Sequence, residues 1–431
     1  MRRLPTASLA AAMMLSACGG GGDDPSRQLG ANPSLPTGKQ YLVPPMRIAR
    51  PVGWGTQTPT VPQGLKVSAL ATGFRNVRSL FVLPNGDILV VEPKAPSDPV
   101  MRPKDIIAGW IKGWGHSSVK GADQITLLRD ADGDGKPELR TVFLDHLNAP
   151  FGIALVGEDL YVANTDAIVR YPYVTGETHI SAPGMILTEL PGGPIDHHWT
   201  KSLVASPDGA KLYVGIGSNS NITERGMAAE LDRARIWEVD RATGAHRAFA
   251  TGLRNPNGLN FNPETGQLWA VINERDELGP DLVPDYLTSV RDGGFYGWPW
   301  SYWGRHVDAR VMPQRPDMVA KAIVPDYSLS SHVAPLGMIF STGSSLSPAY
   351  RNGAFVGEHG SWNRGHFSGY KVVWIPFAGG RPSGGAQDVV AGFLDKSGHA
   401  RGRPVGLAVD GRGALLIADD LSNTIWRVYA G

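Results

Sequence analysis

One short unit recurs six times along this chain of 431 residues, and the repeat limits the folds that the chain can adopt. Each copy contains a turn, an apolar strand, a turn rich in proline, aspartate, asparagine and glycine, and a second strand. The alternation of apolar and polar residues around these turns indicates strands rather than helices. The copies lie roughly 50 to 80 residues apart, at or above the period of a propeller blade, and begin near residues 73, 147, 196, 252, 332 and 401.

The six repeats predict an all-β fold, a six-bladed β-propeller. A single four-stranded blade cannot bury both of its faces, whereas a ring of blades buries them and leaves only short edges. A β-sandwich is the alternative, because its turns also recur. A sandwich, however, does not repeat the same order of turns and strands six times.

In a propeller the equivalent point of every repeat lies near the central channel, so residues far apart in sequence converge there. We therefore expect long loops between the strands to form a site on one face of the ring. Blade-building alone requires small or apolar residues at most of these points. The chain instead has cations and an imidazole there: Arg78, His198, Arg254, Arg401 and Arg403.

The N-terminus has the pattern of an export signal. Two arginines precede an apolar run that is too short to cross a bilayer as a mature helix. The run ends in Leu-Ser-Ala-Cys at Cys18, which is similar to a bacterial lipobox, where the cysteine is lipidated; a plain signal peptide with an incidental cysteine is the alternative. Gly19 implies, by the same resemblance, an outer-membrane lipoprotein that faces the periplasm and contacts the membrane only through its lipid.

Composition narrows the class of protein. A formal net charge of +1 argues against nucleic acid as a partner, because phosphate binding requires a basic patch. The single cysteine leaves the mature domain without a disulfide or a thiol nucleophile. We expect residues 1–18 to be the signal, 19–60 a flexible tether and lead-in, and 61–431 the propeller.

The stretch Gly252–Trp300 contains an unusual concentration of polar groups. It opens with an Arg-Asn-Pro turn and continues through the strand Gln267–Val271 into a loop dense in carboxylates, glycine and proline. Polar groups at the end of a strand usually mark a site, because function lies on loops that a rigid scaffold holds. One cation, several carboxylates and free carbonyls suit an anionic or metal-assisted ligand.

His198 is the candidate general base. It follows Asp196 and His197, and imidazole is the side chain whose pKa best suits general-base catalysis near neutral pH. The alternative is a structural pair of histidines that bonds to its own turn. The position of His198 at the functional end of the repeat favours the base.

Three arginines are candidates for binding an anion. Arg254 either bonds the carbonyls of its turn or stabilises negative charge that develops on a substrate or cofactor oxygen. Arg401 and Arg403 flank one glycine, so both would point the same way from an extended segment. Two guanidiniums on one side suit a polycarboxylate, and a solvated pair on a loop is an equal alternative.

The segment from Asp130 to Gly135 has the D-x-D-x-D-G spacing of a calcium loop. The twelfth position of that loop is Thr141 rather than glutamate, so an EF-hand is not expected. A simple hairpin turn between two strands is the preferred interpretation, and calcium binding by Asp130–Asp134 stays open.

The stretch Gly252–Trp300, the unit Asp196–Asn221 and the pair Arg401 and Arg403 resemble the glucose/sorbosone dehydrogenases. The resemblance covers about residues 61–431 and is greatest to the sorbosone-dehydrogenase-like branch, which Gly357–Arg364 also resembles. It implies a six-bladed propeller that uses pyrroloquinoline quinone (PQQ) and calcium. A planar tricarboxylate such as PQQ would require clustered arginines and a base.

The resemblance also implies roles for individual residues. His198 would take the proton from the sugar hydroxyl as hydride passes to C5 of PQQ. Arg254 would stabilise charge on the cofactor's C5 oxygen, with Asn255 beside it. The backbone carbonyls of Gly279 and Pro280 would bind the calcium that polarises PQQ.

Further residues are expected to hold the cofactor. Arg401 and Arg403 match the pair that grips its carboxylates, and Arg78 occupies the same face. The family's PQQ-binding lysine has two candidate counterparts, Arg364 and Lys371. The glucose enzymes have aspartate directly before the catalytic histidine, where this chain has His197.

The predicted function is therefore PQQ-dependent oxidation of an aldose or related sugar aldehyde, with electrons passed to an external quinone or cytochrome. One alternative is a calcium-dependent lactonase on a similar propeller, which would need carboxylates and asparagines around one metal. A second alternative is a propeller that binds carbohydrate without turnover.

Overall fold

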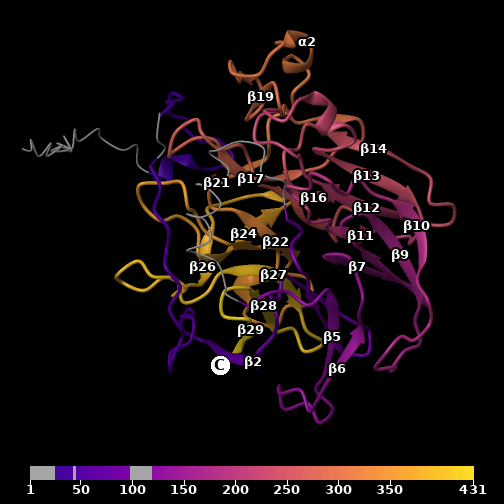
Figure 1. Ribbon diagram of the computed structural model, residues 1–431. Helices are drawn as coiled ribbons and strands as arrows, with labels where there is room; N and C mark the ends of the chain where they lie inside the picture. The colour runs from indigo at the N-terminus through magenta and orange to yellow at the C-terminus, as the bar shows by residue number, and fades with distance from the viewer. Residues whose placement is uncertain (1–24, 42–44, 98–118) are drawn as a thin grey trace, which may run out of the picture.

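The computed structural model describes residues 25–41, 45–97 and 119–431, which form a six-bladed β-propeller (Figure 1). This confirms the fold class predicted from the repeats. Each blade is built on an antiparallel sheet, and the strands recognised in each repeat are its innermost strands. Cys18 and the rest of the predicted signal lie outside the described residues. Within the described ranges, no helix has the length and apolar character needed to span a bilayer.

The first three blades follow one another directly along the chain. Blade 1 contains β3 (Ser79–Val82), β4 (Ile88–Glu92), β5 (Gln124–Arg129) and β6 (Leu139–Leu144). Blade 2 contains β7 (Gly152–Val156), β8 (Asp159–Ala163), β9 (Ala167–Pro172) and β10 (Met185–Glu189). Blade 3 contains β11 (Leu203–Ala205), β12 (Lys211–Ile216), β13 (Arg235–Asp240) and β14 (His246–Thr251), with β18 (Gly294–Phe295) parallel to β14.

The last three blades take strands from more distant parts of the chain. Blade 4 contains β15 (Pro256–Phe261), β16 (Leu268–Ile272), β17 (Pro284–Ser289), β21 (Tyr327–Ser331) and, at its edge, β1 (Leu29–Gly30). Blade 5 contains β22 (Pro335–Phe340), β23 (Gly353–Glu358), β24 (Lys371–Ala378), β25 (Arg381–Pro382) and β26 (Gln387–Val390). Blade 6 contains β27 (Pro404–Val409), β28 (Leu415–Asp419), β29 (Thr424–Ala430) and β2 (Leu65–Thr72).

An insertion between β17 and β21 extends beyond the ring, and Figure 1 shows its β19 and α2 at the top of the view. It contains β18, the pair β19 (Ser301–Tyr302) and β20 (His306–Val307), and the short helix α2 (Pro316–Val319). The remaining elements are the 3₁₀ turns η1 (Pro25–Gln28), η2 (Met227–Glu230) and η3 (Pro348–Tyr350).

The ring closes because blade 6 takes its outer strand from the N-terminal side of the chain. Strand β2 pairs antiparallel with β29, from Leu65 opposite Ala430 to Thr72 opposite Thr424. The innermost strand of blade 6, β27, contacts β3 of blade 1. Such closure leaves no open gap between the first and last blades.

The core consists of six buried apolar clusters, one between each pair of neighbouring blades. The second strand of a blade is covered on both faces, and β4, β16 and β28 are buried at every residue. This explains their near-continuous apolar sequences, which are typical of strands buried on both faces.

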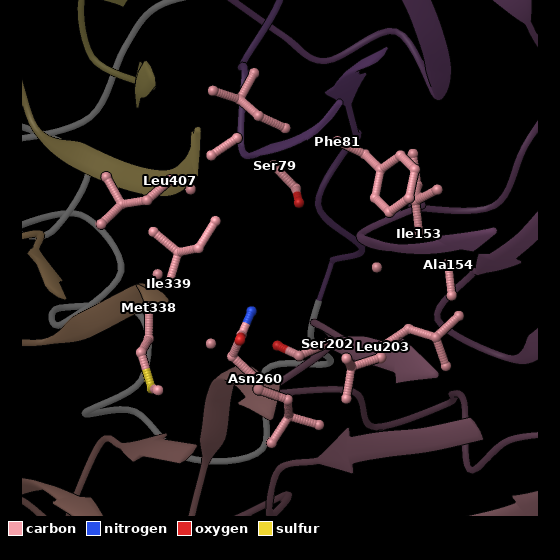
Figure 2. A pocket seen from close by; sticks show the side chains of 18 of the residues that line it. Ser79, Phe81, Ile153, Ala154, Ser202, Leu203, Asn260, Met338, Ile339 and Leu407 are labelled. Atoms are coloured by element: carbon pink, nitrogen blue, oxygen red, sulfur yellow. The ribbon is translucent and has the colours of Figure 1, made fainter. Parts of the chain in front are cut away.

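The six innermost strands surround a central cavity of about 400 Å³ (Figure 2). Its wall is mainly apolar, and polar side chains enter it at Ser79, Ser202 and Asn260. The apolar lining includes Phe81, Ile153, Ala154, Leu203, Met338, Ile339 and Leu407. Leu336 lines this cavity and also the polar cavity at one end of the ring, so the two spaces adjoin.

The described part of the lead-in packs against blades 4 to 6. Strand β1 extends blade 4, and the amide of Lys39 donates to the carbonyl of Leu278 at 2.8 Å. Ala49 is fully buried, and the indole of Trp54 donates to Asp419 at 3.2 Å. These residues are therefore part of the folded body and lie close to the loops at one end of the ring.

Candidate active site

Polar side chains gather at the end of the ring where each innermost strand begins and each second strand ends. Arg78 precedes β3, Arg254 precedes β15 and Arg403 precedes β27. A cavity of about 290 Å³ opens between these loops. Its charged and titratable wall residues are Arg78, His197, His198, Arg254, Glu274, Asp276, Asp285, His332, His359 and Arg403.

A second cavity of about 570 Å³ adjoins the first through a shared wall of Arg78, His359 and Arg403. It adds the Trp199 ring, with the Arg78 guanidinium 6.0 Å from the ring centre. It also adds Asp420 and loop residues between β4 and β5. The shared cations can therefore contact a ligand that extends from one space into the other.

His198 is held in one tautomer. Its Nδ1 lies 2.7 Å from the carbonyl oxygen of Ser218, and a carbonyl can only accept, so Nδ1 carries the proton. Burial lowers the pKa of His198 well below its usual value, and the charge of Arg254 and the ring of His197 lower it further. The imidazole is therefore neutral at pH 7, with its lone pair on Nε2, as a general base requires.

Arg254 places a fixed positive charge beside His198. Its side chain is buried and donates to the backbone carbonyls of Glu274 at 2.8 Å and Asn273 at 3.3 Å, and to Oδ1 of Asn221 at 3.1 Å. Asp276 lies 3.6 Å from the same guanidinium. Because these contacts hold the charge before any ligand binds, no reorganisation is needed to stabilise an oxyanion.

Arg78 and His359 share one buried carboxylate. Nη1 of Arg78 lies 2.5 Å from Asp420, and Nε2 of His359 lies 3.0 and 3.1 Å from its two oxygens. Burial alone would raise the pKa of Asp420, but His359 and Arg78 outweigh burial and hold it well below its usual range. Asp420 is thus an anion that fixes the Arg78 guanidinium and the His359 imidazole in the cavity wall.

Arg403 contributes a third guanidinium to the cavity. It donates to the Tyr370 hydroxyl at 3.2 Å, and its guanidinium lies 5.3 Å from the centre of that ring. Among the described residues, neither Nε of Arg403 nor Nε of Arg78 has a hydrogen-bond partner, although both atoms are buried. Buried donors are normally satisfied, so these two nitrogens suit an anionic ligand in the cavity.

Three carboxylates also line the cavity: Glu274, Asp276 and Asp285. Burial raises the pKa of Glu274 to about 7 and that of Asp285 to about 6. Asp285 accepts hydrogen bonds from the amides of Glu274 and Ala334, both at 2.8 Å. With Asp276, these residues give an oxygen-rich part of the wall beside Arg254.

The remaining residues predicted for the site lie outside the lining of the cavity. The Gly279 carbonyl accepts from Nε2 of His332 at 3.1 Å, and Pro280 follows it in the same loop. Neither is among the residues that line the cavity, and Arg401 is not among them either, although Arg403 is. Asn255, in contrast, lines the cavity beside Arg254.

The two candidates for the PQQ lysine have other partners. Arg364 is 1 % exposed and bonds the Asp281 carboxylate at 2.5 Å and the Ser331 carbonyl at 2.9 Å. Lys371 is half-buried on β24, where its ammonium bonds Asp388 at 2.7 Å. Neither is part of the cavity wall, so the structure does not choose between them.

Several wall residues were missed in the sequence, although the repeat held a signal for some of them. His359 directly follows β23 and Asp420 directly follows β28. Glu274, in the carboxylate-rich loop that the sequence did single out, has the equivalent place after β16. These are equivalent ends of second strands, and the same repeat argument that selected Arg78 and Arg403 applies to them. His332 and Asn363 lie on longer loops and have no such signal.

The acidic segment at Asp130 forms the hairpin turn between β5 and β6, which confirms the preferred interpretation. Carboxylate oxygens of Asp130, Asp132, Asp134 and Glu138 lie within 4.8 Å of one another. Asp130 also accepts from the amides of Gly133 and Gly135 at 2.7 and 2.9 Å. The hairpin has a turn role of its own, and whether it binds calcium stays open.

Two family models match the chain: glucose / sorbosone dehydrogenase over residues 156–361 and TrAA12-like over residues 317–431. An uncharacterized protein of Borreliella burgdorferi is 28 % identical over 293 residues, 66 % of this chain and 76 % of the relative. An aldose sugar dehydrogenase of Escherichia coli is 25 % identical over 188 residues, 40 % of this chain and 48 % of the relative.

A solved structure extends the likeness to the whole ring. The PQQ domain of pyranose dehydrogenase from Coprinopsis cinerea, in its holo form, has a TM-score of 0.68 and 19 % identity, over 86 % of this chain and 97 % of that one. This likeness concerns the propeller fold. The similarity to the glucose/sorbosone dehydrogenases is carried by the family-model match over residues 156–361.

Proposed function

We propose that this protein is a PQQ-dependent dehydrogenase that oxidises an aldose or related sugar aldehyde. The observation that carries the proposal is one cavity in which a neutral imidazole, His198, lies with three guanidiniums, those of Arg78, Arg254 and Arg403. The family-model match and the propeller relatives support the same class of enzyme.

PQQ fits the donors of this cavity. It is a planar tricarboxylate, and the unpartnered Nε atoms of Arg78 and Arg403 are buried donors of the kind that carboxylate oxygens satisfy. When bound, PQQ supplies the acceptor for the hydride of the sugar. Arg254 and Asn255, which line the cavity, would be the residues that hold a cofactor oxygen, and the charge of Arg254 would favour negative charge there.

His198 supplies the base. Its Nε2 is free of the proton and receives the proton of the sugar hydroxyl, while the Ser218 carbonyl keeps Nδ1 protonated and the ring oriented. The positive charge that forms on the imidazole is unfavourable beside Arg254, which returns the proton to solvent after turnover. The ring of His197 packs edge-on against that of His198, with 4.7 Å between ring centres. His197 therefore helps to hold the base in place and lowers its pKa.

Calcium fits the loop after β16 by the chemistry of its donors, because Ca²⁺ prefers carboxylate and carbonyl oxygens. We propose the carbonyls of Gly279 and Pro280 as ligands. The Gly279 oxygen accepts one hydrogen bond from His332 and keeps a second lone pair. The carboxylates of Asp276 and Asp285 give the nearby wall the negative potential that attracts a divalent cation.

The finer features of the proposal follow from the sequence. They are a sorbosone-dehydrogenase-like preference, export with a lipid on Cys18, an outer-membrane location facing the periplasm, and a quinone or cytochrome as electron acceptor. Globomycin treatment of expressing cells, followed by mass spectrometry of the N-terminus, tests the anchor. Cleavage without lipid at Cys18 would contradict it.

Absorption difference spectra test the central proposal. Purified protein is titrated with PQQ in the presence of calcium, and a sugar panel is then added. We expect saturable binding of PQQ and reduction of the bound cofactor by at least one aldose. Absence of PQQ binding at micromolar concentration would overturn the proposal.

A calcium-dependent lactonase is the second candidate, and one observation favours it. The cavity wall contains asparagines and carboxylates, including Asn273, Asn363, Asp276 and Asp285, as such a metal site requires. Hydrolysis of sugar lactones by calcium-loaded protein without PQQ would favour this reading. Tight binding of a carbohydrate, with neither PQQ-dependent oxidation nor lactone hydrolysis, would indicate a propeller that binds carbohydrate without turnover.

A further inference from the structure

His198 lies on a loop whose shape depends on a buried arginine from a different part of blade 3. Arg233 is 3 % exposed and lies between Asp232 and Ala234, which have φ of 58° and 52°. Two residues other than glycine in the left-handed region are costly, and such strain gathers at functional sites. This backbone turns the Arg233 side chain inward, beneath the cavity.

Arg233 joins the two segments that hold His198. Nη2 donates to the Pro191 carbonyl at 2.6 Å and to the Asp196 carboxylate at 2.6 Å, both on the loop that leads to His198. Nη1 donates to the Gly217 carbonyl at 3.0 Å. Gly217 precedes Ser218, whose carbonyl accepts the proton of His198 Nδ1, so one guanidinium fixes both the base and its hydrogen-bond acceptor.

The carboxylate of Asp196 organises the other side of the base. It accepts from Arg233 and from the Thr165 hydroxyl, and the Lys201 ammonium lies 3.5 Å away. Thr165 and Lys201 also donate to the Trp199 carbonyl, at 3.1 and 3.0 Å. His198 is thus bracketed by a fixed side chain two residues before it and a fixed carbonyl one residue after it.

Arg233, Asp196 and Lys201 are all buried, although burying charged groups costs free energy. This indicates that they have a role other than stabilising the fold. Lys201 is 0 % exposed, and burial lowers its pKa to about 8. A buried ion pair is a weak stabiliser, because desolvation offsets the attraction between its charges.

We propose that Arg233, Asp196 and Lys201 form a buried clamp that positions His198 for general-base catalysis. The proposal rests on the proposed function, because it assigns the clamp to the base of that reaction. The clamp residues contact neither substrate nor cofactor and are positioning residues. A displacement of the base of about 1 Å can lower a rate by about 100-fold, so the clamp acts on kcat rather than on binding.

Arg233→Met and Arg233→Lys test the clamp. Arg233→Met removes both the charge and the three-way contact, and we expect kcat to fall by about 10- to 100-fold, with KM and the Kd of PQQ nearly unchanged. Arg233→Lys keeps the charge and one contact, and should recover part of kcat. Thr165→Val removes one hydroxyl from the clamp and should show a smaller fall in kcat, which keeps the test valid if Arg233→Met does not fold.

The pH profile of kcat/KM adds a second readout, because it reports the pKa of the base in the free enzyme. The charges that face His198 are those of Arg254 and Arg233, with His197 alongside, and each lowers its pKa. Removing the Arg233 charge raises the pKa of His198, so the acid limb should move to higher pH in Arg233→Met and stay in place in Arg233→Lys. An unmoved limb in Arg233→Met would contradict the clamp.

Asp87→Asn is the matched control. Asp87 is 2 % exposed and bonds Arg129 through both oxygens, at 2.8 and 2.7 Å, in the turn between β3 and β4 at the other end of the ring. It should lower the melting temperature without changing kcat or the pH profile. Equal losses of kcat in Asp87→Asn and Arg233→Met would overturn the proposal.

PQQ titration separates this proposal from the one on which it rests. If the unmodified protein neither binds PQQ nor reduces it with sugar, the proposed function fails. If it turns over and Arg233→Met keeps its kcat within about twofold, a change smaller than mispositioning produces, the clamp fails alone. If Arg233→Met loses affinity for PQQ instead of kcat, Arg233 shapes the cofactor site and the clamp also fails.

Discussion

The two ends of the propeller are made from the same strands and treat charge in opposite ways. At the end formed by the turns between first and second strands, charged groups lie in separate ion pairs, and at least one partner reaches solvent, as in the pairs of Lys211 with Asp240 and of Arg129 with Asp87. At the cavity end, Arg254, Glu274 and Asp285 are buried. A ring of blades needs only the first arrangement, so the second indicates selection for a ligand.

Of the substitutions that test the difference between the two ends, His198→Ala at the cavity end should lower kcat the most. We expect kcat to fall by about 1,000-fold or more, as the loss of a general base does, while PQQ binding remains. His197→Ala should be much milder, because the imidazole that the Ser218 carbonyl orients is that of His198. Stopped-flow reduction of bound PQQ measures both, and equal complete loss would leave the base unassigned.

Glu274→Gln should remove a pH dependence of stability that is specific to the cavity end. Burial raises the pKa of folded Glu274 from 4.5 to about 7. The folded state then binds the proton more tightly than the unfolded state, so stability is highest below about pH 4.5 and falls as the pH rises through about 7. This fall amounts to about 3 kcal/mol at most.

Urea unfolding at several pH values, in the presence of a chelator, measures this fall. The slope of stability against pH should be shallower in Glu274→Gln than in the unmodified protein. Glu264→Gln is the matched control, since Glu264 is exposed in the turn between β15 and β16. A slope that Glu274→Gln leaves unchanged would show that other groups determine it.

Arg403→Gln and Arg401→Gln compare two arginines of one loop, of which only Arg403 lines a cavity. Arg403 lines both cavities and has a buried unpartnered Nε, whereas Arg401 is half-exposed and lines neither. Arg403→Gln should weaken PQQ binding by about 10-fold, the loss of one charge-assisted hydrogen bond. Arg401→Gln should change it little, and the reverse ranking in an absorption titration would move the carboxylate contact to Arg401.

Asp87→Asn should have the smallest effect, confined to stability. It weakens a two-oxygen bond to Arg129 at the turn end, and we expect a loss of about 1 to 3 kcal/mol in the free energy of unfolding. Chemical denaturation measures the loss. Any change in PQQ affinity would mean that the two ends are coupled through blade 1.

The repeat was enough to predict the ring and the face that carries the site, because equivalent strand ends of all blades lie at the same end of the propeller. It therefore identified Arg78, His198, Arg254 and Arg403 as residues that converge. It missed His359 and Asp420, which follow second strands rather than precede first strands. The contacts of Arg364 and Gly279 could not be predicted, since they depend on Asp281 and His332 in long loops without a repeating pattern.

The pairing of β2 with β29 has a consequence for biogenesis. The strand that begins at Leu65 is synthesised early and finds its partner only when the chain reaches Ala430. Until then β2 presents an unpaired edge, which is a template for association with other chains. A protein of this design benefits from chaperones that keep the chain unfolded until its last blade has emerged.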